Sequence, residues 1–535
     1  MKLLGSQRQW SWTTAMLLLV VAWCGIVGAQ EMAPTTAPAA AMMDAAAAAV
    51  TDAAAPAAAE APATPTAFYN GIDTGSTAWM LTSTAFVLFM VPGLALFYGG
   101  MVRAKNVLNM FLMVMVCIGV VGLLWVIYGY AVAFPVVGEG NLLIARSMDG
   151  GAEGSIISLL AFEPKLLFLN ALTENWNSTL TSGDTIGAVS TGIPELVFVM
   201  FQGKFAIITP ALIVGALAER VRFGPLILFI VLWSTLIYLP VAHWVWNVNG
   251  WLFQMGVLDF AGGTVVHVLG GVSALAVCLV LGPRAGYGRT PMPPHSLGLT
   301  LIGAGLLWFG WFGFNAGSAI AIGGGENPVA GGVAALAFVN TQTAAAAAAT
   351  IWMLVEWLHG GKPTILGFAS GMVAGLVVIT PCAGHVLPWH SIVIGGLGGV
   401  VCYFGCRLKN VFKYDDSLDA FGVHGIGGAL GAVLVGFFAV RPMVDGVGVG
   451  GMPQVMKQLF AVTVCAIFCF VGSYIIAQII KSTIGLRVKL QDELDGLDIS
   501  IHGESGYNLT EPLGGYVEGA EGHPDARGSS PAMAR

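Results

Sequence analysis

The chain has 535 residues, of which 56% are hydrophobic and 10% are charged, and its formal net charge is −7 at pH 7. Soluble domains carry about 25% charged residues, so a mean hydropathy of +0.80 over this length excludes a large soluble core and predicts many membrane spans. The 73 glycines favour tight packing of membrane helices, because small residues let helix backbones approach one another.

The first 29 residues have the pattern of a secretory signal peptide. Two basic residues precede an apolar run over 15–27, and the sequence Val27-Gly28-Ala29 offers a cleavage site after Ala29. Residues 30–70 are rich in Ala, Pro and Thr with scattered acids, which predicts a linker without fixed structure outside the cytoplasm.

Residues 71–482 predict an all-α transmembrane domain with eleven helices, because eleven apolar segments have the length of a membrane span. These segments lie at 77–99, 108–134, 194–217, 224–242, 260–282, 298–319, 330–357, 364–380, 390–407, 418–440 and 456–480. Lys and Arg are concentrated in alternate loops and in the tail 483–535, which places the tail in the cytoplasm and the mature N-terminus outside. We therefore expect a multi-pass protein of the bacterial cytoplasmic (inner) membrane.

Two similar stretches, "DFAGGTVVHVLGG" (259–271) and "DAFGVHGIGG" (419–428), fall on the fifth and tenth predicted spans. Each contains an acid, a nearby Phe and the sequence His-x-x-Gly-Gly. Since five is an odd number, the second half must cross the membrane in the opposite direction to the first. This predicts an inverted 5+5 repeat plus a final helix, with the substrate site near the midplane between the halves.

Of the nine histidines, His267 and His424 are the two that lie inside predicted spans. An ionisable residue in the bilayer costs about 2.5–3.5 kcal/mol on insertion scales and is a functional candidate. The nearby glycines allow the two helices to approach, so that one imidazole nitrogen can donate to the other. The alternative is that each neutral histidine bonds a backbone carbonyl or a serine. For Asp259, capping of the helix start is the main expectation and substrate contact the alternative.

Four aromatic residues are predicted at the outward ends of spans three, four and six, with a serine hydroxyl beside them. Aromatic faces attract cations by about 0.5–2 kcal/mol each, so such a group suits a small monovalent cation. The alternative is an ordinary aromatic belt at the membrane interface. The five residues are Phe201, Phe205, Trp246, Phe314 and Ser318.

Below this mouth we expect a hydrophobic bore that leads to the histidines and favours a neutral or deprotonated substrate. Its predicted lining is Leu94, Phe97, Leu212 and Trp311. The spans carry no acidic ring or carbonyl filter of the kind that ion channels use. No nucleotide-binding loop, hydrolytic triad, metal site or nucleic-acid motif is indicated, so neither an ATP-driven pump nor an enzyme is expected.

Six stretches, in this order, resemble the ammonium transporters of the Amt/Mep/Rh superfamily, and in particular its microbial Amt branch. They are "FVLFMVPGLALFYGGMVRAKNVLNM", "GALAERVRFG", "DFAGGTVVH", "GWFGFNAGSA", "ALAFVNT" and "DAFGVHGIGG". The similarity runs from about residue 75 to about residue 508. It implies a homotrimer in the lipid bilayer, in which each eleven-helix subunit has its own pore for ammonium or ammonia, with methylammonium as an analogue.

The resemblance also implies roles for individual residues. Phe201, Phe205, Trp246 and Ser318 would recruit ammonium, Phe205 and Phe314 would form a stacked gate, and His267 and His424 would line the pore. Asp259 would be a supporting carboxylate, and Thr341 would assist near the outer mouth.

The tail sequence "GLDISIHGESGYNL" (496–509) resembles the family's cytoplasmic C-terminal region. The resemblance implies that the tail contacts neighbouring subunits and that a PII-type signalling protein plugs the pore. Four features depart from the simplest members of the family. They are the long loop 135–193, the Ala/Pro linker before the first span, the extra polar tail 510–535, and Lys204, one residue before the gate. We expect Lys204 to point away from the pore and to reach outward, although its charge could weaken cation recruitment.

Two other functions remain open at this point. The pore could act as an ammonium sensor that signals through the tail with little flux, although no fused kinase or cyclase domain is visible. Alternatively, His267 and His424 could ligate a haem in an electron-transfer protein. The leading hypothesis is an ammonium transporter without a cofactor.

Overall fold

The computed structural model describes residues 72–135, 141–146, 156–173, 192–322, 329–440 and 450–507. All of them belong to one unit of the chain, which begins at Tyr69. The expected signal peptide, the linker and residues 508–535 lie outside the described residues.

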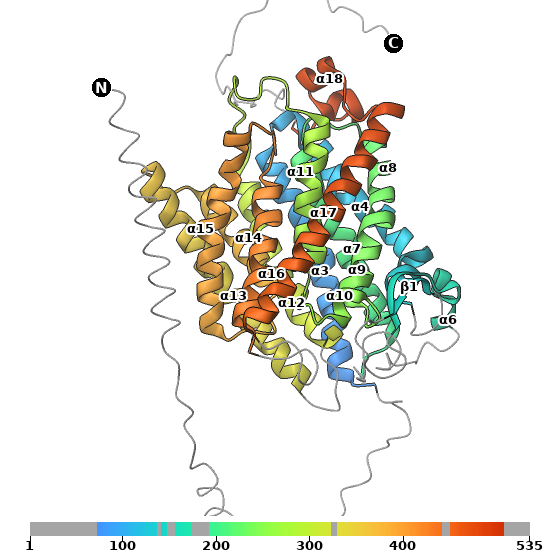
Figure 1. Ribbon diagram of the computed structural model, residues 1–535. Helices are drawn as coiled ribbons and strands as arrows, with labels where there is room; N and C mark the ends of the chain where they lie inside the picture. The colour runs from blue at the N-terminus through green and yellow to red at the C-terminus, as the bar shows by residue number, and fades with distance from the viewer. Residues whose placement is uncertain are drawn as a thin grey trace, which may run out of the picture. The chain divides into compact units, whose positions relative to one another are not determined.

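Ten helical segments of the described chain are long and apolar enough to cross a membrane, and α14 (Ile365–Ile379) is a shorter apolar helix. Each of the eleven predicted spans matches one of these segments, so the all-α fold with eleven spans is confirmed (Figure 1). The ten long segments are α3 (Thr74–Met101), η1 to α5 through α4 and η2 (Ala104–Ala133), α7 (Glu195–Leu217), α8 to α9 through η4 (Phe223–Trp246), η5 with α11 (Gly263–Leu281), α12 (Leu297–Ile322), α13 (Val329–Gly360), α15 (Pro388–Phe412), η6 with α16 (Phe421–Phe438) and α17 (Met452–Thr483).

The loop between α5 and α7 contains a small structured unit that the sequence predicted only as a long loop. Strands β1 (Asn141–Arg146) and β2 (Ile156–Ala161) form an antiparallel hairpin, followed by η3 (Pro164–Leu169) and α6 (Asn170–Thr173). The Ser158 N–H donates to the Asn249 carbonyl at 2.9 Å, and the Trp244 indole N–H donates to the Leu159 carbonyl at 2.7 Å. The hairpin therefore rests on the connection between α9 and α10 (Trp251–Gln254).

The described part of the tail packs at the opposite end of the helices, as α18 (Leu490–Asp495) and the π-helical turn η7 (Asp498–His502) (Figure 1). The Asp498 carboxylate accepts from the N–H groups of Leu108 (3.1 Å) and Asn109 (2.8 Å). It thereby caps α4 (Val107–Leu124), which has no side-chain cap at its own N-cap residue. We call this end the tail end and the other the hairpin end.

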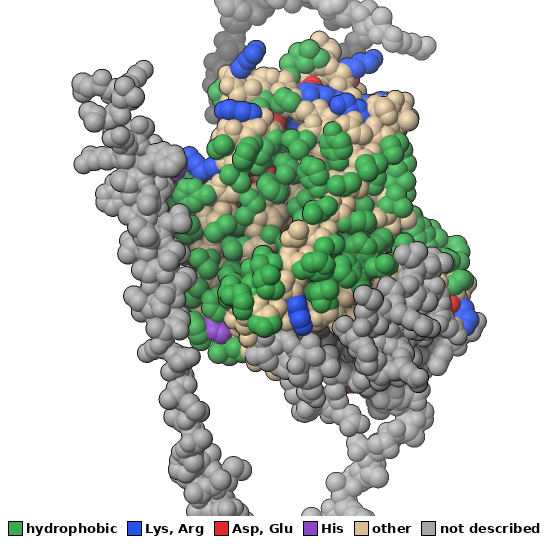
Figure 2. Space-filling view, in the orientation of Figure 1, with side chains coloured by type: hydrophobic (Ala, Val, Ile, Leu, Met, Phe, Trp, Pro, Cys, Tyr) green, Lys and Arg blue, Asp and Glu red, His purple; other side chains and the backbone are tan. Residues whose placement is uncertain are grey.

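The distribution of side chains on the surface follows the helix axes. Figure 2 shows hydrophobic side chains over most of the visible face and Lys and Arg side chains gathered at the tail end. A broad apolar band is what a helix bundle needs where it meets lipid. Inside this band, the two histidine-bearing segments pack against each other: η5 contacts α16, and η6 contacts α11.

Candidate functional site

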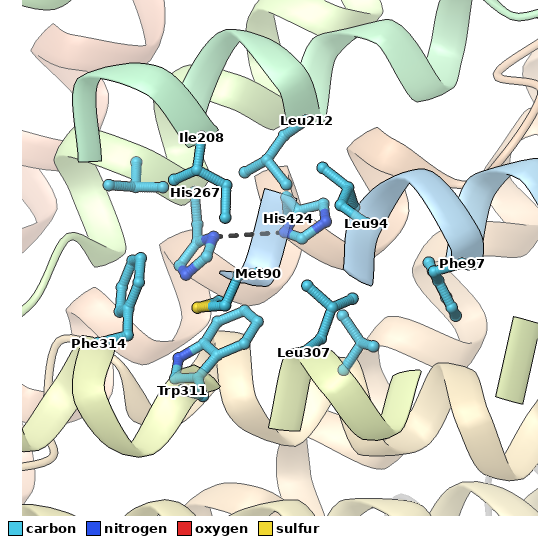
Figure 3. A pocket seen from close by; sticks show the side chains of 12 residues that line it. Met90, Leu94, Phe97, Ile208, Leu212, His267, Leu307, Trp311, Phe314 and His424 are labelled. Carbon is cyan, nitrogen blue, oxygen red and sulfur yellow. Dashed lines mark hydrogen bonds between the residues drawn. The ribbon is translucent and has the colours of Figure 1, made fainter. Parts of the chain in front are cut away.

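Two buried imidazoles form the centre of the site. His267 lies on the π-helical turn η5 (Gly263–Val268) and His424 on the equivalent turn η6 (Phe421–Gly425). Their Nδ1 atoms are 3.3 Å apart, and the ring planes are nearly parallel at 18° (Figure 3). One ring therefore donates to the other, and which one donates depends on the tautomers. The structure thus places the two histidines in direct contact.

Glycines on both segments permit this close approach. A Cβ atom placed on Gly271 would lie 2.0 Å from the Gly425 nitrogen, and one placed on Gly428 would lie 2.7 Å from the Gly263 carbonyl oxygen. Both clashes are with backbone atoms, so a larger residue at either position would force the two segments apart.

Asp259 anchors the start of the first histidine segment. Its main-chain carbonyl accepts a hydrogen bond from the Trp246 indole at 3.0 Å, so the same residue also orients Trp246. Its buried carboxylate caps η5, as expected, through the N–H groups of Gly262 (3.1 Å), Gly263 (2.5 Å), Thr264 (3.0 Å) and Val265 (3.1 Å).

The counterpart of Asp259 in the second half is Asp416, and not Asp419, the acid that opens the second similar stretch. Asp416 stands eight residues before His424, as Asp259 stands eight residues before His267. Its carboxylate accepts from the N–H groups of Ala420 (3.1 Å) and Phe421 (2.8 Å). Asp419 instead has a positive φ of 60° and forms an ion pair with Lys409 at 2.6 Å. Burial and the nearby charge of Asp419 raise the pKa of Asp416.

The predicted aromatic residues come together at the hairpin end of the histidine pair. The Phe205 ring is central, with centroid distances of 4.9 Å to Phe201, 5.7 Å to Trp246 and 4.4 Å to Phe314. All four rings are buried. The Ser318 hydroxyl is also buried and donates to the Phe314 carbonyl at 2.9 Å, so its oxygen atom lies one helical turn from Phe314.

Thr341 does not join this group directly. Its hydroxyl donates to the Ala337 carbonyl at 2.6 Å and accepts from the Asn315 amide at 2.9 Å. Asn315 follows Phe314, so these bonds link Thr341 to Phe314 through Asn315.

A narrow cavity is lined by both histidines (Figure 3). Its lining is apolar except for the two imidazoles and one indole, and it includes the four residues predicted for the bore. His267 Nε2 is buried and has no hydrogen-bond partner among the described residues, so this atom is free to bind a small molecule. The lining consists of Met90, Leu94, Phe97, Ile208, Leu212, Val266, His267, Leu307, Trp311, Phe314, Val373 and His424.

Thr380 is a site residue that the sequence reasoning missed. Its hydroxyl accepts a hydrogen bond from the Trp311 indole at 2.9 Å and donates to the Leu376 carbonyl at 2.7 Å. The Trp311 ring stacks on His267, with centroids 5.4 Å apart and planes at 19°. Thr380 thus orients the ring that covers His267, and nothing in the local sequence around Thr380 signals this role.

Lys204 has 9% of its surface exposed, and α7 is buried along nearly its whole length. Its aliphatic stem therefore packs within the bundle, one residue before Phe205. The outward direction of its amine stays a prediction.

At the tail end, a buried ion network ties the loops together. Glu219 bonds Arg103 at 2.9 Å and Arg284 at 3.0 Å, and Arg284 also bonds Asp415 at 2.8 Å. Burial favours a raised pKa for Glu219, but the hydrogen bond and charge of Arg103 and the charge of Arg284 hold it at about 2. Four interhelical loops are thereby tied together at this end of the bundle.

The histidine geometry does not suit a haem. Axial histidines stand on opposite faces of a porphyrin with the iron between them, whereas these rings contact each other directly at 3.3 Å. Among the described residues, no group of three or more His, Cys, Asp or Glu side chains could hold a metal ion.

Residues 78–507 match the model of the Ammonium Transporter Family. The chain is 44% identical over 438 residues to an ammonium transporter of Bacillus subtilis, covering 81% of this chain and 98% of that protein. It is 42% identical to the ammonium transporter Amt1 of Archaeoglobus fulgidus, covering 81% and 99%. The crystal structure of Candida albicans Mep2 is similar at 30% identity and a TM-score of 0.66, covering 79% of this chain and 88% of that one. The chain therefore belongs to the ammonium transporter family.

Proposed function

We propose that the protein recruits NH4+ at Phe201, Phe205, Trp246 and Ser318 and conducts ammonia or ammonium past His267 and His424. The observation that carries the proposal is the buried histidine pair, 3.3 Å apart, in an apolar cavity directly below the aromatic group. The ring faces attract a small cation, and the Ser318 oxygen can accept one of its hydrogen bonds.

The cavity below the rings favours the neutral form of the substrate. Transfer of an unpaired charge into apolar surroundings is far more costly than transfer of a neutral molecule that keeps a hydrogen bond. NH3 can bond His267 Nε2, the imidazole atom that has no partner among the described residues. The NH3 molecule then moves from His267 to His424 by exchanging its hydrogen bond from one imidazole to the other.

The gate is formed by Phe205 and Phe314, whose rings lie 4.4 Å apart at 41°. At this separation the rings are in contact, so passage requires at least one of them to rotate. Rotation of a side chain is fast compared with movement of a helix, and such a gate lets single small molecules pass while it keeps a continuous water column out.

Reconstituted protein in liposomes tests the proposal through uptake of labelled methylammonium. We expect His267→Ala and Trp246→Leu to reduce uptake at least tenfold, which corresponds to about 1.4 kcal/mol. The matched controls are His295→Ala and Trp244→Leu. His295 bonds Tyr507 at the tail end, and Trp244 bonds the hairpin. Uptake equal to that of the controls would refute the roles of the site residues. Liposomes that take up no methylammonium at all would favour the sensor.

Assembly, partners and orientation form a second part of the proposal. A homotrimer, a PII-type partner at the tail end, and an inner-membrane location with the tail in the cytoplasm all fit the family. The gathering of Lys and Arg at the tail end supports this orientation (Figure 2). Mass measurement of the detergent-solubilised protein tests the trimer, and modification of a cysteine introduced in the tail of inverted vesicles tests the orientation.

A further inference from the structure

The last membrane span, α17, carries a glutamine that is fully buried, Gln458. Its Oε1 atom accepts from the Leu258 N–H at 2.8 Å and from the Gln454 amide at 3.2 Å. Its Nε2 atom donates to the carbonyls of Leu258 at 2.7 Å and Ala432 at 2.8 Å. A side-chain amide has two donors and two acceptor positions, so Gln458 uses its full capacity. This pattern of partners also assigns which end of the amide is the oxygen.

These bonds join the two halves of the chain. Leu258 lies in the connection between α10 and η5, which leads to His267. Ala432 lies on α16 (Ile426–Phe438), eight residues after His424. One side chain of the eleventh span therefore bonds both of the halves that carry the histidines.

Leu258 is the residue through which Gln458 can act on the aromatic group. It precedes Asp259, whose carbonyl accepts from the Trp246 indole at 3.0 Å. Because Gln458 bonds both the N–H and the carbonyl of Leu258, it fixes the direction in which the chain enters Asp259. The buried amide, the Leu258 backbone and the Asp259 carbonyl thus form a continuous chain of contacts that ends at the Trp246 ring.

A second amide on α17 supports the same connection. Gln454 is 4% exposed, lies one turn before Gln458 and donates to the Gly256 carbonyl at 2.8 Å. Gly256 has a φ of 80°, in the left-handed region that glycine adopts readily, so the connection turns sharply at this point. The two amides therefore hold the connection at two backbone positions, Gly256 and Leu258.

We propose that Gln458 is a positioning residue for cation recruitment, which it serves by holding the Asp259 carbonyl against the Trp246 indole. The inference rests on the proposed function, because Trp246 acts there as a recruiting residue. The four bonds from η5 to the Asp259 carboxylate lie within residues 259–265 and do not involve Gln458. Loss of the amide should therefore raise the substrate concentration needed for uptake and leave passage past the histidines largely intact.

Concentration-dependent uptake of labelled methylammonium by the full-length protein in liposomes tests this role. We expect Gln458→Leu to raise the half-saturating concentration about tenfold, which corresponds to about 1.4 kcal/mol, and to change the maximal rate less than about twofold. The matched control is Ser473→Ala on the same helix. Ser473 is buried and bonds Ser273, six residues beyond His267, at 2.8 Å. Its variant should keep the half-saturating concentration of the wild type within about twofold.

A double-mutant cycle separates positioning from a general loss of packing. Trp246→Leu alone should raise the half-saturating concentration, and Gln458→Leu should then add less than about twofold in that background, because the ring that it positions is gone. Equal effects of Gln458→Leu in both backgrounds, or a Gln458→Leu variant that behaves like Ser473→Ala, would overturn the inference and leave the recruitment site intact. A wild-type half-saturating concentration in Trp246→Leu would refute the recruitment site and this inference together.

Should Gln458→Leu fail to fold, Gln454→Leu takes its place in the cycle. It removes the bond to Gly256 and one of the two bonds to the Gln458 oxygen, while both bonds to Leu258 remain. We therefore expect a smaller rise of about threefold, which Trp246→Leu should again abolish. A half-saturating concentration equal to that of the wild type would then overturn the inference.

Discussion

Removal of the Asp259 carboxylate should destabilise the protein about twice as much as removal of its counterpart Asp416. Asp259 accepts from four backbone N–H groups of η5, whereas Asp416 accepts from two N–H groups at the start of its own segment. At about 1 kcal/mol for each lost bond, Asp259→Ala should cost roughly 4 kcal/mol and Asp416→Ala roughly 2 kcal/mol. The difference is the informative quantity, because both carboxylates are buried and both incur the desolvation cost of a buried charge.

The assay is unfolding of the purified protein in one detergent, followed by tryptophan fluorescence at fixed pH. Asp73→Ala is the control, since Asp73 caps α3 with a bond to Ser76 at a solvent-exposed position. Asp259→Asn should fall between wild type and Asp259→Ala, because its amide oxygen can accept from some of the N–H groups while its NH2 group repels the others. Equal losses for Asp259→Ala and Asp416→Ala, or a loss no larger than that of Asp73→Ala, would refute the reasoning.

Three further predictions concern single side chains near the pore or at the tail end. Thr380→Val leaves the buried Trp311 indole without its acceptor and should lower the free energy of unfolding by about 1–3 kcal/mol. Methylammonium uptake should fall several-fold. Uptake equal to that of the wild type would show that Trp311 is held by packing alone. Lys204→Met replaces the charged end of a largely buried side chain by an apolar chain of similar length. The melting temperature and the uptake at low methylammonium concentration should therefore both rise, and a lower melting temperature would contradict this. Because the pKa of Glu219 is lowered from 4.5 to about 2, its stabilisation, roughly 3 kcal/mol, is present above pH 4.5 and is lost as the pH falls toward 2. The stability difference between wild type and Glu219→Gln should therefore shrink over this range, and a difference that is constant with pH would refute the ionic origin.

Most of the fold follows from the sequence, because membrane helices have a strong signal. Every described span coincides with a run of apolar residues, and a run of that length in lipid has few alternatives to a helix. The hairpin of β1 and β2 was not predicted, since its two strands are short and their pairing depends on support from Asn249 and Trp244, about 90 residues further along the chain.

The residues of the candidate site were predictable where their type is unusual for its surroundings. His267 and His424 are conspicuous because ionisable residues in a span are costly, and the aromatic residues are conspicuous because they lie at helix ends. Thr380 could not be found in this way. A hydroxyl in a membrane helix commonly bonds its own backbone, so only the three-dimensional structure shows that the Thr380 hydroxyl also accepts from the Trp311 indole.

In both halves of the chain the histidine lies on a π-helical turn. The halves differ in the turn that precedes this segment. The nearest acid before His424 is Asp419, whereas counting back from each histidine pairs Asp259 with Asp416 at the same spacing of eight residues. The histidine is the better reference, because its position is fixed by contact with the other half, while the residues before it are free to form a different turn. In the first half, four N–H groups of that turn donate to the Asp259 carboxylate. The Asp259 carbonyl also accepts a hydrogen bond from the Trp246 indole. In the second half, two N–H groups donate to the Asp416 carboxylate, and the second acid, Asp419, forms an ion pair with Lys409. The stronger anchor thus lies on the side where the aromatic group must be held in place.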